Sequence, residues 1–344
     1  MNKHTREELK LYQSLPLEVK IRMSEERIRG WVKTFGEDGV YISFSGGKDS
    51  TVLMDIIRNR MHYDIPAVFS DTGLEYPEIR EFVKTFDNVT WIKPKMNFKE
   101  IINKYGYPLV SKEVSFAVDG SRRFLNNKEK YKNKKPLPVQ NPNDEYKPYA
   151  LLRLQGKIGT AGSKGYSMFN CEKWEFLLDS PFPISSKCCD KMKKEPFKNY
   201  FKETGRYPIT AQMASESRLR YKNWLQHGCN MFTANKPMSN PLSFWTEQDV
   251  LEYIKKYNVK ICSVYGDIIE DNECLKCTGL DRTGCMFCGY GCHQDEPGRG
   301  RFELMKKTHP KVYDYIMRPA EEGGLDYKNV IDWLNEHGNL NIKY

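Results

Sequence analysis

Residues 41–50 read Tyr-Ile-Ser-Phe-Ser-Gly-Gly-Lys-Asp-Ser, and this stretch decides the fold. An apolar run typical of a β-strand, residues 39–44, leads directly into Ser45-Gly-Gly-Lys-Asp-Ser50, and helical spacing of apolar residues follows. Two glycines let backbone N–H groups come close to a phosphate, and a helix N-terminus adds partial positive charge. Lys48 supplies a mobile cation, and the flanking serines supply hydroxyl donors. The order of strand, glycine turn and helix therefore predicts a phosphate-binding loop.

The loop is not of the Walker type. That pattern needs a glycine five residues before the Gly-Lys pair and a serine or threonine after it. Here these positions hold Ile42 and Asp49. Taken alone, the residues leave one alternative, an ordinary Gly-Gly turn with a solvated lysine.

Around this loop, helical and extended patterns alternate. Such alternation predicts a parallel sheet with helices on both faces and a ligand at the carboxyl ends of the strands. Ser45 and Asp71 each follow such an end. The expected helices are 17–36, 49–60, 77–86 and 97–105, and the expected strands are 39–44, 66–70, 89–93 and 207–211.

Residues 120–165 interrupt the alternation with a basic stretch that contains aromatic residues and is followed by several prolines. Basic and aromatic residues together can hold a nucleic-acid backbone and stack its bases. The alternative is a solvated helix face followed by a proline-containing loop. The predicted organisation is an N-terminal helical segment (1–36), a nucleotide-binding α/β domain (37–119 and 166–260), a basic, partly mobile insert (120–165) and a Cys-rich helical C-terminal region (261–344).

Composition indicates a globular protein with an acidic ligand. The 344 residues include 54 Lys+Arg against 45 Asp+Glu, a net charge of +9, which fits ATP or nucleic acid. The first residues lack the apolar core of a signal peptide, and no run approaches the length of a membrane span. We therefore expect a cytoplasmic protein without membrane contact.

Ten cysteines in such a compartment indicate metal binding or chemistry more than disulfides. The Cys-x-x-Cys pairs beginning at Cys274 and Cys285 could form a four-cysteine zinc site, since a tight turn places two thiolates on one metal. The adjacent Cys188 and Cys189 suit an iron–sulfur cluster better, because neighbouring thiolates can bind different iron atoms. Absence of any metal is the third possibility.

Several motifs resemble a known family. Ser45–Ser50 resembles the pyrophosphate-binding (PP) loop of the ATP pyrophosphatase superfamily. Asp71–Pro77 and Asn240–Ile254 resemble segments of the phosphoadenosine phosphosulfate (PAPS) reductase family. The Cys-Cys pair, followed about a hundred residues later by Cys285-x-x-Cys288, looks like the [4Fe–4S] signature of adenylyl-sulfate reductases. The resemblance implies an adenine nucleotide alpha hydrolase-like, Rossmann-like parallel sheet with a helical Cys-rich C-terminal region.

The chain departs from the reductases at three points. It has no cysteine after Cys292 to act as the attacking thiolate of the family's C-terminal tail. Met213 occupies the position of the first arginine in the family's substrate segment, although Glu216, Ser217 and Arg220 match it. The PP-loop is intact, whereas the reductases often carry a degraded one. The combination is most similar to the Dnd-type ATP pyrophosphatases of DNA phosphorothioation.

The resemblance thus implies an adenylating sulfurtransferase that cleaves ATP to AMP and pyrophosphate and directs sulfur onto nucleic acid, as in DNA phosphorothioation or tRNA thiolation. A sulfonucleotide reductase with a non-standard thiol is one alternative, and a nucleotide- or nucleic-acid-binding module without catalysis is another. Implied partners are Mg²⁺ and a sulfur donor such as a cysteine desulfurase, and the oligomeric state stays open, a dimer included.

Site residues follow from the loop and from the resemblance. The catalytic candidates are Lys48 and Asp49, and the substrate-binding candidates are Lys187, Glu216, Arg218 and Arg220. The [4Fe–4S] ligands are Cys188, Cys189, Cys285 and Cys288, with zinc as the alternative metal. The ATP-binding candidates are Ser43, Phe44, Ser45, Gly46, Gly47, Lys48, Asp49, Ser50, Ser70, Asp71, Thr72 and Gly73.

Overall fold

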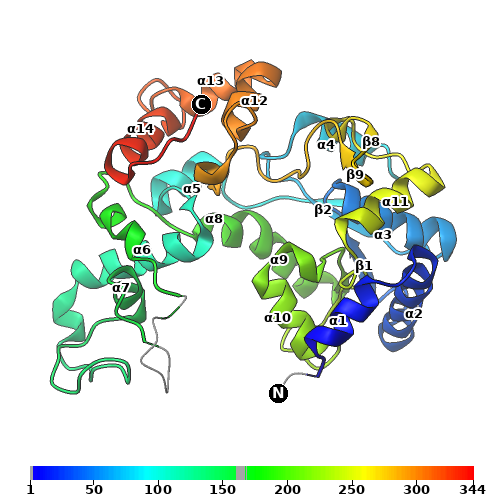
Figure 1. Ribbon diagram of the computed structural model, residues 1–344, viewed down its shortest axis with the longest axis horizontal. Helices are drawn as coiled ribbons and strands as arrows, with labels where there is room; N and C mark the ends of the chain where they lie inside the picture. Colours follow the sequence, from blue (N-terminus) through cyan, green and yellow to red (C-terminus); the bar gives the residue numbers. More distant parts are fainter. Residues whose placement is uncertain (1–2, 160–166, 168) are drawn as a thin grey trace. The chain divides into compact units, whose positions relative to one another are not determined.

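The computed structural model describes residues 3–159, 167 and 169–344, and the chain forms two compact units (Figure 1). Unit 1 comprises Met1–Pro94 and Lys193–Cys285, and unit 2 comprises Lys95–Met192 and Met286–Tyr344. This division differs from the predicted ranges. Residues 95–119 belong to unit 2 because helices α5 (Phe98–Tyr105) and α6 (Lys112–Leu125) pack against α8 (Lys187–Cys189) and α7 (Tyr149–Leu154) of that unit. Residues 160–165 of the predicted insert lie outside the described residues.

Unit 1 is built on a six-stranded sheet with the order β3-β2-β1-β5-β7-β6. All neighbouring pairs are parallel except β6 and β7, which are antiparallel. The registers Ile42↔Ala67 and Ala67↔Val89 align the first three strands. The strands are β1 (Val40–Ser43), β2 (Ala67–Ser70), β3 (Val89–Ile92), β5 (Tyr207–Ile209), β6 (Asn230–Met231) and β7 (Met238–Ser239).

Helices cover both faces of this sheet. Successive side chains of a strand point to opposite faces, and here the apolar side chains on each face are buried under helices. Ile42 and Phe69 belong to the main core with residues of α2, α3 and α11. Tyr41 and Val68 pack on the other face with Tyr200 of α9. The α/β class of parallel strands with helices on both sides is thereby confirmed.

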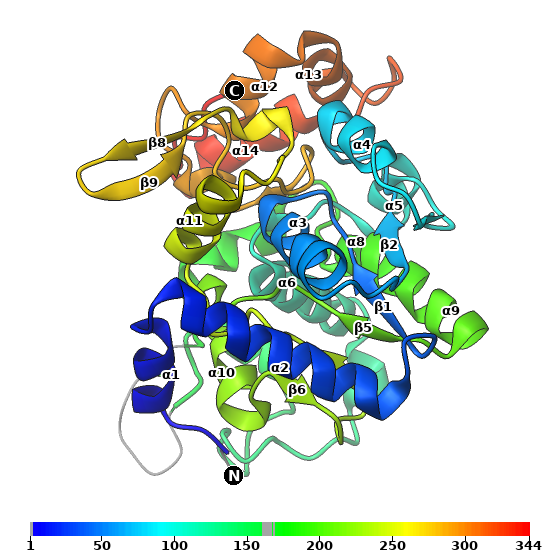
Figure 2. The ribbon, with the colours of Figure 1, turned by 90° about the vertical axis from the view of Figure 1, so that its right-hand side faces the viewer.

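The helices of unit 1 lie close to their predicted bounds. Figure 2 shows α2 as a long helix beside the sheet. The expected helix 49–60 continues from α3 into one π-helical turn, Ile56–Arg60. The helices are α1 (Arg6–Gln13), α2 (Leu17–Phe35), α3 (Lys48–Asp55), α4 (Pro77–Lys84), α9 (Glu195–Thr204), α10 (Arg218–His227) and α11 (Glu247–Tyr257), and a hairpin of β8 (Ile268–Asp271) and β9 (Cys274–Cys277) follows.

A buried ion pair fixes the start of α11. Thr246 and Asp249 form a capping box there, which satisfies backbone N–H groups of the first turn. Lys20 of α2 is only 1% exposed, and its ammonium lies 2.7 Å from one Asp249 carboxylate oxygen. Removing one partner of such a pair typically costs about 3–5 kcal/mol. Glu247, in the first turn of α11, is therefore held at a defined place.

Unit 2 is mainly helical. Arg122 of α6 donates hydrogen bonds to the backbone carbonyls of Leu177, Leu178, Ser180 and Phe182, which fixes the 172–179 segment against this helix. The helices are α5 (Phe98–Tyr105), α6 (Lys112–Leu125), α7 (Tyr149–Leu154), α8 (Lys187–Cys189), α12 (Arg301–Thr308), α13 (Pro310–Met317) and α14 (Tyr327–Gly338), and β4 (Leu109–Val110) pairs with β10 (Gly289–Tyr290) in parallel.

The helical C-terminal region expected from the sequence is present as α12, α13 and α14. In the described part of the chain, no helix combines the length and the apolar character that a bilayer crossing requires.

Candidate nucleotide-binding site

The turn between β1 and α3 requires glycine at position 46. Gly46 has a φ of +72°, a region that side chains of L-residues rarely adopt. A Cβ atom there would also lie 2.8 Å from a methyl carbon of Ile79 and 2.8 Å from one of Val83. The turn therefore packs directly on α4, and this packing fixes the path of the chain into α3.

Two serine hydroxyls shape the same turn. The Ser50 hydroxyl accepts the backbone N–H of Ser45 at 3.2 Å and donates to the Gly47 carbonyl at 2.9 Å. The two serine oxygens lie 3.0 Å apart. These bonds cross the turn and hold it in shape before any ligand binds.

Lys48 is buried at the start of α3 and has three partners. Its backbone N–H donates to the Tyr265 hydroxyl at 3.1 Å, and its ammonium donates to the Asp281 carbonyl at 2.6 Å. The ammonium also lies 3.1 Å from a carboxylate oxygen of Glu247. Burial acts to lower the pKa of Lys48, but the carboxylates of Asp49 and Glu247 outweigh it and raise the pKa. The lysine therefore carries its charge at neutral pH.

Asp49 offers an oxygen without a partner. Its Oδ1 atom is buried and makes no hydrogen bond among the described residues. Burial raises the pKa of this carboxyl, although the positive charge of Lys48 opposes the change. An unpartnered carboxylate oxygen is the kind of ligand that a hard cation such as Mg²⁺ prefers.

A cavity of about 650 Å³ opens over this turn. It lies between the neighbouring strands β1 and β5. After β1 the chain continues to β2 on one side of this pair, and after β5 it continues to β6 and β7 on the other side. Ser43, Ser70 and Thr210 at the strand ends line its wall. Such a switch point is where open parallel sheets bind their ligands. The ATP-binding candidates that line the cavity are Ser43, Phe44, Ser45, Gly47, Lys48, Asp49, Ser50 and Ser70.

The other ATP-binding candidates do not line it. Gly46 packs beneath the turn, and Asp71 forms an ion pair with Arg80 at 3.0 Å. Thr72 donates its backbone N–H and its hydroxyl to the Glu75 carboxylate at 3.0 and 2.6 Å. Asp71, Thr72 and Gly73 thus build the turn after β2, and from this turn Glu75 reaches the cavity wall.

Of the substrate-binding candidates, Glu216 and Arg220 line the cavity and form an ion pair with each other. Arg218 is exposed at the start of α10 and is not part of the lining, and Lys187 belongs to unit 2. Burial, followed by the nearby charge of Arg282, lowers the pKa of Arg220. Two guanidinium groups that repel each other at one cavity favour the binding of an anion.

Several residues that line the cavity were not predicted from the sequence. They belong to the second segment of unit 1, Lys193–Cys285. Glu247 lies within the family-like segment Asn240–Ile254, which assigns it no role, and Arg282 stands three residues before Cys285 outside any recognised motif. The ion pair of Glu247 with Lys48 and the effect of the Arg282 charge on Asp49 depend on tertiary packing of α11 and of the segment after β9. The missed lining residues include Lys193, Thr246, Glu247, Tyr265, Arg282 and Thr283.

In unit 2, three of the predicted cluster ligands lie near one tyrosine. Burial raises the pKa of Tyr290, and the thiols of Cys189, Cys288 and Cys188 act in the same direction. The hydroxyl of Tyr290 is buried, and Ser115 acts on its pKa in the opposite direction. The donor set is chemically suited to iron or zinc, which prefer thiolates. Cys285 belongs to unit 1.

Ligand geometry is not formed in the described residues, where no three Cys, His, Asp or Glu side chains are arranged to hold a metal ion. Cys274 and Cys277 also differ from the expected tight turn. They lie in the extended strand β9, in which side chains three positions apart face opposite sides of the sheet. The [4Fe–4S] cluster and its zinc alternative therefore remain predictions.

A mainly parallel sheet with a glycine turn and a cavity at its switch point is typical of nucleotide-binding α/β proteins. The chain belongs to the phosphoadenosine phosphosulfate reductase domain family, whose model matches residues 39–132 and 157–289. The family is one of enzymes, and membership supports nucleotide binding and a role in sulfur transfer or reduction.

Individual relatives add little to this assignment. Two uncharacterized proteins of Methanocaldococcus jannaschii are 34% identical over 106 residues and 38% identical over 73 residues. These matches cover 24% and 20% of this chain, and only 25% and 15% of the relatives. A PAPS reductase from Candida auris, solved as a phosphate complex, is 15% identical over 75% of this chain and 90% of its own, with a TM-score of 0.36.

Proposed function

We propose that this protein is an ATP pyrophosphatase that adenylates a substrate for sulfur transfer, with nucleic acid as the acceptor. The observation that carries the proposal is the turn Ser45–Ser50, which presents Lys48 and the start of α3 to a cavity of about 650 Å³. Family membership supports an enzyme of nucleotide and sulfur chemistry.

The residues divide the work by charge. Backbone N–H groups of the turn and the Lys48 ammonium stabilise the pyrophosphate as it leaves, while an acceptor oxygen attacks the α-phosphorus. Asp49 is the residue that would bind Mg²⁺, and this cation would neutralise charge on the phosphate oxygens. Arg220 and Arg282 supply positive charge at the same cavity, where an anionic acceptor would bind.

The sulfur would come from a donor such as a cysteine desulfurase. Cys188, Cys189, Cys285 and Cys288 are the proposed ligands of a [4Fe–4S] cluster, with zinc as the alternative. The support for this part is the chemistry of the thiols near Tyr290. When bound, such a cluster would supply a thiolate-held iron site at which sulfur can be exchanged.

Product analysis tests the proposal. The protein is incubated with ATP labelled at the α-phosphate, Mg²⁺, sulfide and fractionated RNA or DNA, so that sulfur can displace AMP from the adenylated acceptor, and AMP is separated from ADP. We expect AMP and pyrophosphate in equal amounts, at least a hundredfold less in Lys48→Ala, and an unchanged yield in the exposed control Lys33→Ala. ADP as the product, or unchanged turnover in Lys48→Ala, would contradict the proposal.

A reductase that uses a non-standard thiol is the second candidate, and one observation favours it. Cys277 lies on β9, which packs against α11, and the positive charge of Lys48 opposes the rise that burial causes in the pKa of this thiol. In this reaction the thiolate would attack the sulfur of a sulfonucleotide, the nucleotide would leave, and an added thiol would release sulfite. This candidate would be favoured if the wild-type protein releases sulfite from adenylyl sulfate and the Cys277→Ser variant does not. Nucleotide binding without any turnover would favour the module without catalysis.

A further inference from the structure

We infer that the α6–α7 face of unit 2 is a binding surface for single-stranded nucleic acid, with Phe116, Tyr149 and Phe169 as base-stacking residues. The inference rests on the proposed function for the identity of the acceptor. The three side chains are 55%, 47% and 58% exposed. Exposed aromatic rings are the surfaces on which unpaired bases stack, whatever their sequence.

Arg153 brings the three rings to one face. Its guanidinium donates to the Phe169 carbonyl at 2.8 Å and to the Glu113 carboxylate at 3.0 Å. Glu113 and Phe116 are three positions apart on α6, and Tyr149 and Arg153 are four apart on α7. Residues with these spacings lie on the same side of a helix. Phe116 and Tyr149 therefore lie on the helix sides that carry the Arg153–Glu113 pair, and the backbone of Phe169 is held at the same pair.

The two helices are close at this face. A Cβ atom on Gly120 of α6 would lie 3.1 Å from the Cβ atom of Ala150 on α7. Gly120 is one turn after Phe116, and Ala150 directly follows Tyr149. The absence of a side chain at position 120 thus lets the helices that carry these rings approach each other.

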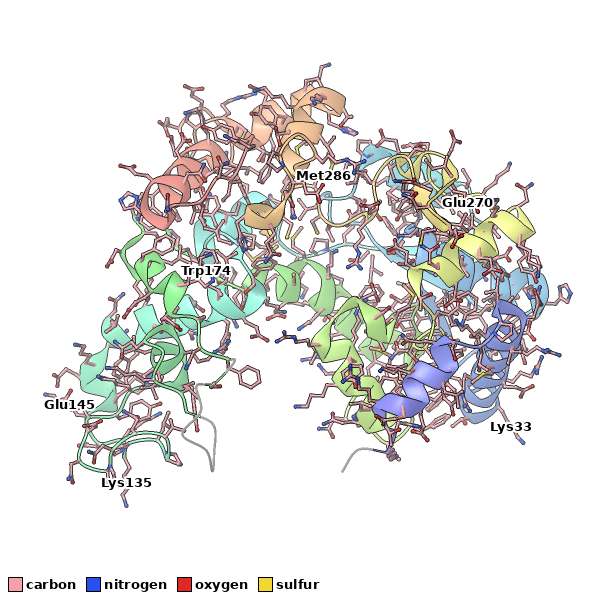
Figure 3. All side chains as sticks on the ribbon, viewed as in Figure 1. Lys33, Lys135, Glu145, Trp174, Glu270 and Met286 are labelled. Atoms are coloured by element: carbon pink, nitrogen blue, oxygen red, sulfur yellow. The ribbon has the colours of Figure 1, made fainter. Side chains whose placement is uncertain are left out.

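Positive charge is concentrated in the segment that contains Phe116 and Tyr149. Residues 112–157 contain eleven Lys and Arg against five Asp and Glu, which is six of the nine net positive charges of the chain. Lys128, Lys130 and Lys135 are exposed, and in the described part of the chain none of them forms an ion pair. Figure 3 shows Lys135 at the outer edge of this part of unit 2. Such a charge attracts a phosphate backbone.

The basic segment has its own aromatic core. The rings of Tyr131 and Tyr146 are stacked with centroids 5.9 Å apart, and the Lys134 ammonium lies 5.0 and 5.4 Å from the two centroids. Phe124 of α6 packs edge-on against both tyrosines. The exposed lysines therefore stand on a folded segment next to α6, and they are available to follow a nucleic-acid backbone past the three rings.

Fluorescence anisotropy with labelled 20-nucleotide single strands of RNA and DNA, and with the corresponding duplexes, tests the inference on the full chain. We expect single strands to bind more tightly than duplexes. Alanine at all three ring positions should weaken single-strand binding about a hundredfold. Phe116→Leu keeps apolar area but loses the ring and should weaken binding about fivefold, whereas Phe116→Trp should retain it. The control is Leu11→Ala, which removes a 59% exposed residue of unit 1.

The lysines are tested through the salt dependence. Glutamine at Lys128, Lys130 and Lys135 should reduce the slope of log affinity against log salt by about 2, since each phosphate contact on a single strand contributes about 0.7. Glutamine at the exposed Lys10, Lys33 and Lys202 of unit 1 is the matched control and should leave the slope unchanged.

Three outcomes would overturn the inference. The first is an unchanged affinity for single strands in the triple alanine variant. The second is an equal affinity for single strands and duplexes. The third is that the control variants of unit 1 lose as much affinity as the variants of unit 2. Strand binding without pyrophosphate release would reject the proposed function and leave the surface intact. Pyrophosphate release with unaltered strand binding in the ring variants would reject the surface alone.

Discussion

The backbone N–H of Lys48 donates a 3.1 Å hydrogen bond to the hydroxyl of Tyr265, which is 217 positions away in the chain. The same hydroxyl lies 2.7 Å from the Thr283 hydroxyl, and a Cβ atom on Gly47 would be 3.2 Å from both oxygens. Two protein hydroxyls thus occupy the mouth of the turn, where a phosphate oxygen would accept the same N–H.

Tyr265→Phe should make the unliganded protein less stable and tighten ATP binding. The change leaves a buried N–H without its acceptor, which costs about 1 kcal/mol, and a phosphate oxygen can replace that acceptor. We expect a lower melting temperature without ATP and about a fivefold lower Kd for ATP. Calorimetric titration and thermal melts measure both effects, with Tyr257→Phe as the control because Tyr257 instead bonds Glu18. Weaker ATP binding would show that the hydroxyl contacts the nucleotide itself.

Glu247→Gln should also tighten ATP binding. The Glu247 carboxylate pairs with Lys48 and adds negative charge beside the cavity. The carboxylate is 46% exposed, so the pair contributes at most about 1 kcal/mol, and the expected gain in affinity is up to about fivefold. Glu252→Gln on the exposed side of α11 is the control. If Glu247→Gln instead loses affinity, the carboxylate holds Lys48 in its binding position.

Asp49→Asn should stabilise the protein while it abolishes Mg²⁺-dependent turnover. Burial raises the pKa of Asp49 above its ordinary value of 3.8. At a pH between the pKa of the unfolded state and that of the folded state, the folded state therefore binds more protons than the unfolded state. Stability therefore falls as pH rises through that range. We expect a gain of about 1 kcal/mol at pH 7 that disappears below pH 4.

Urea unfolding at pH 7 and pH 4 measures this gain. The exposed Asp38→Asn serves as the control and should change neither stability nor turnover. A loss of stability at pH 7 would mean that the Asp49 carboxylate is bound favourably by its cationic neighbours.

The cluster is tested by anaerobic purification. We expect a brown protein with absorbance near 400 nm and four iron and four sulfide per chain, and loss of both in Cys188→Ser and Cys288→Ser. Cys274→Ser is the matched control, because Cys274 is exposed on β9. A colourless protein that contains zinc would overturn the cluster in favour of its alternative.

The sequence was sufficient for the parts of the fold that local patterns determine. The expected strand 39–44 and helix 77–86 correspond to β1 and α4, because apolar spacing and the glycine turn act over a few residues. The family resemblance also led correctly to the PAPS reductase domain.

The features that could not be predicted from the sequence depend on contacts between residues far apart in the chain. No local pattern shows that Tyr265 and Arg282 approach Lys48 and Asp49. The predicted turn at Cys274–Cys277 was wrong because hairpin pairing with Ile268–Asp271 holds this segment extended. Phe116 and Phe169 are 53 positions apart, and it is Arg153 that joins the Phe169 backbone to Glu113, one turn before Phe116.

The central claim, that the Ser45–Ser50 turn holds a triphosphate, is tested most directly by calorimetric titration with α,β-methylene-ATP, which cannot be cut at its inner anhydride. We expect one molecule bound per chain, and at least a tenfold loss of affinity in Gly46→Ala, where the new methyl group meets Ile79 and Val83. Gly36→Ala is the control, because Gly36 has a similar φ of +77° and no atom within 4 Å of the added carbon. Equal affinity in wild type and Gly46→Ala, or no binding to wild type, would contradict the claim.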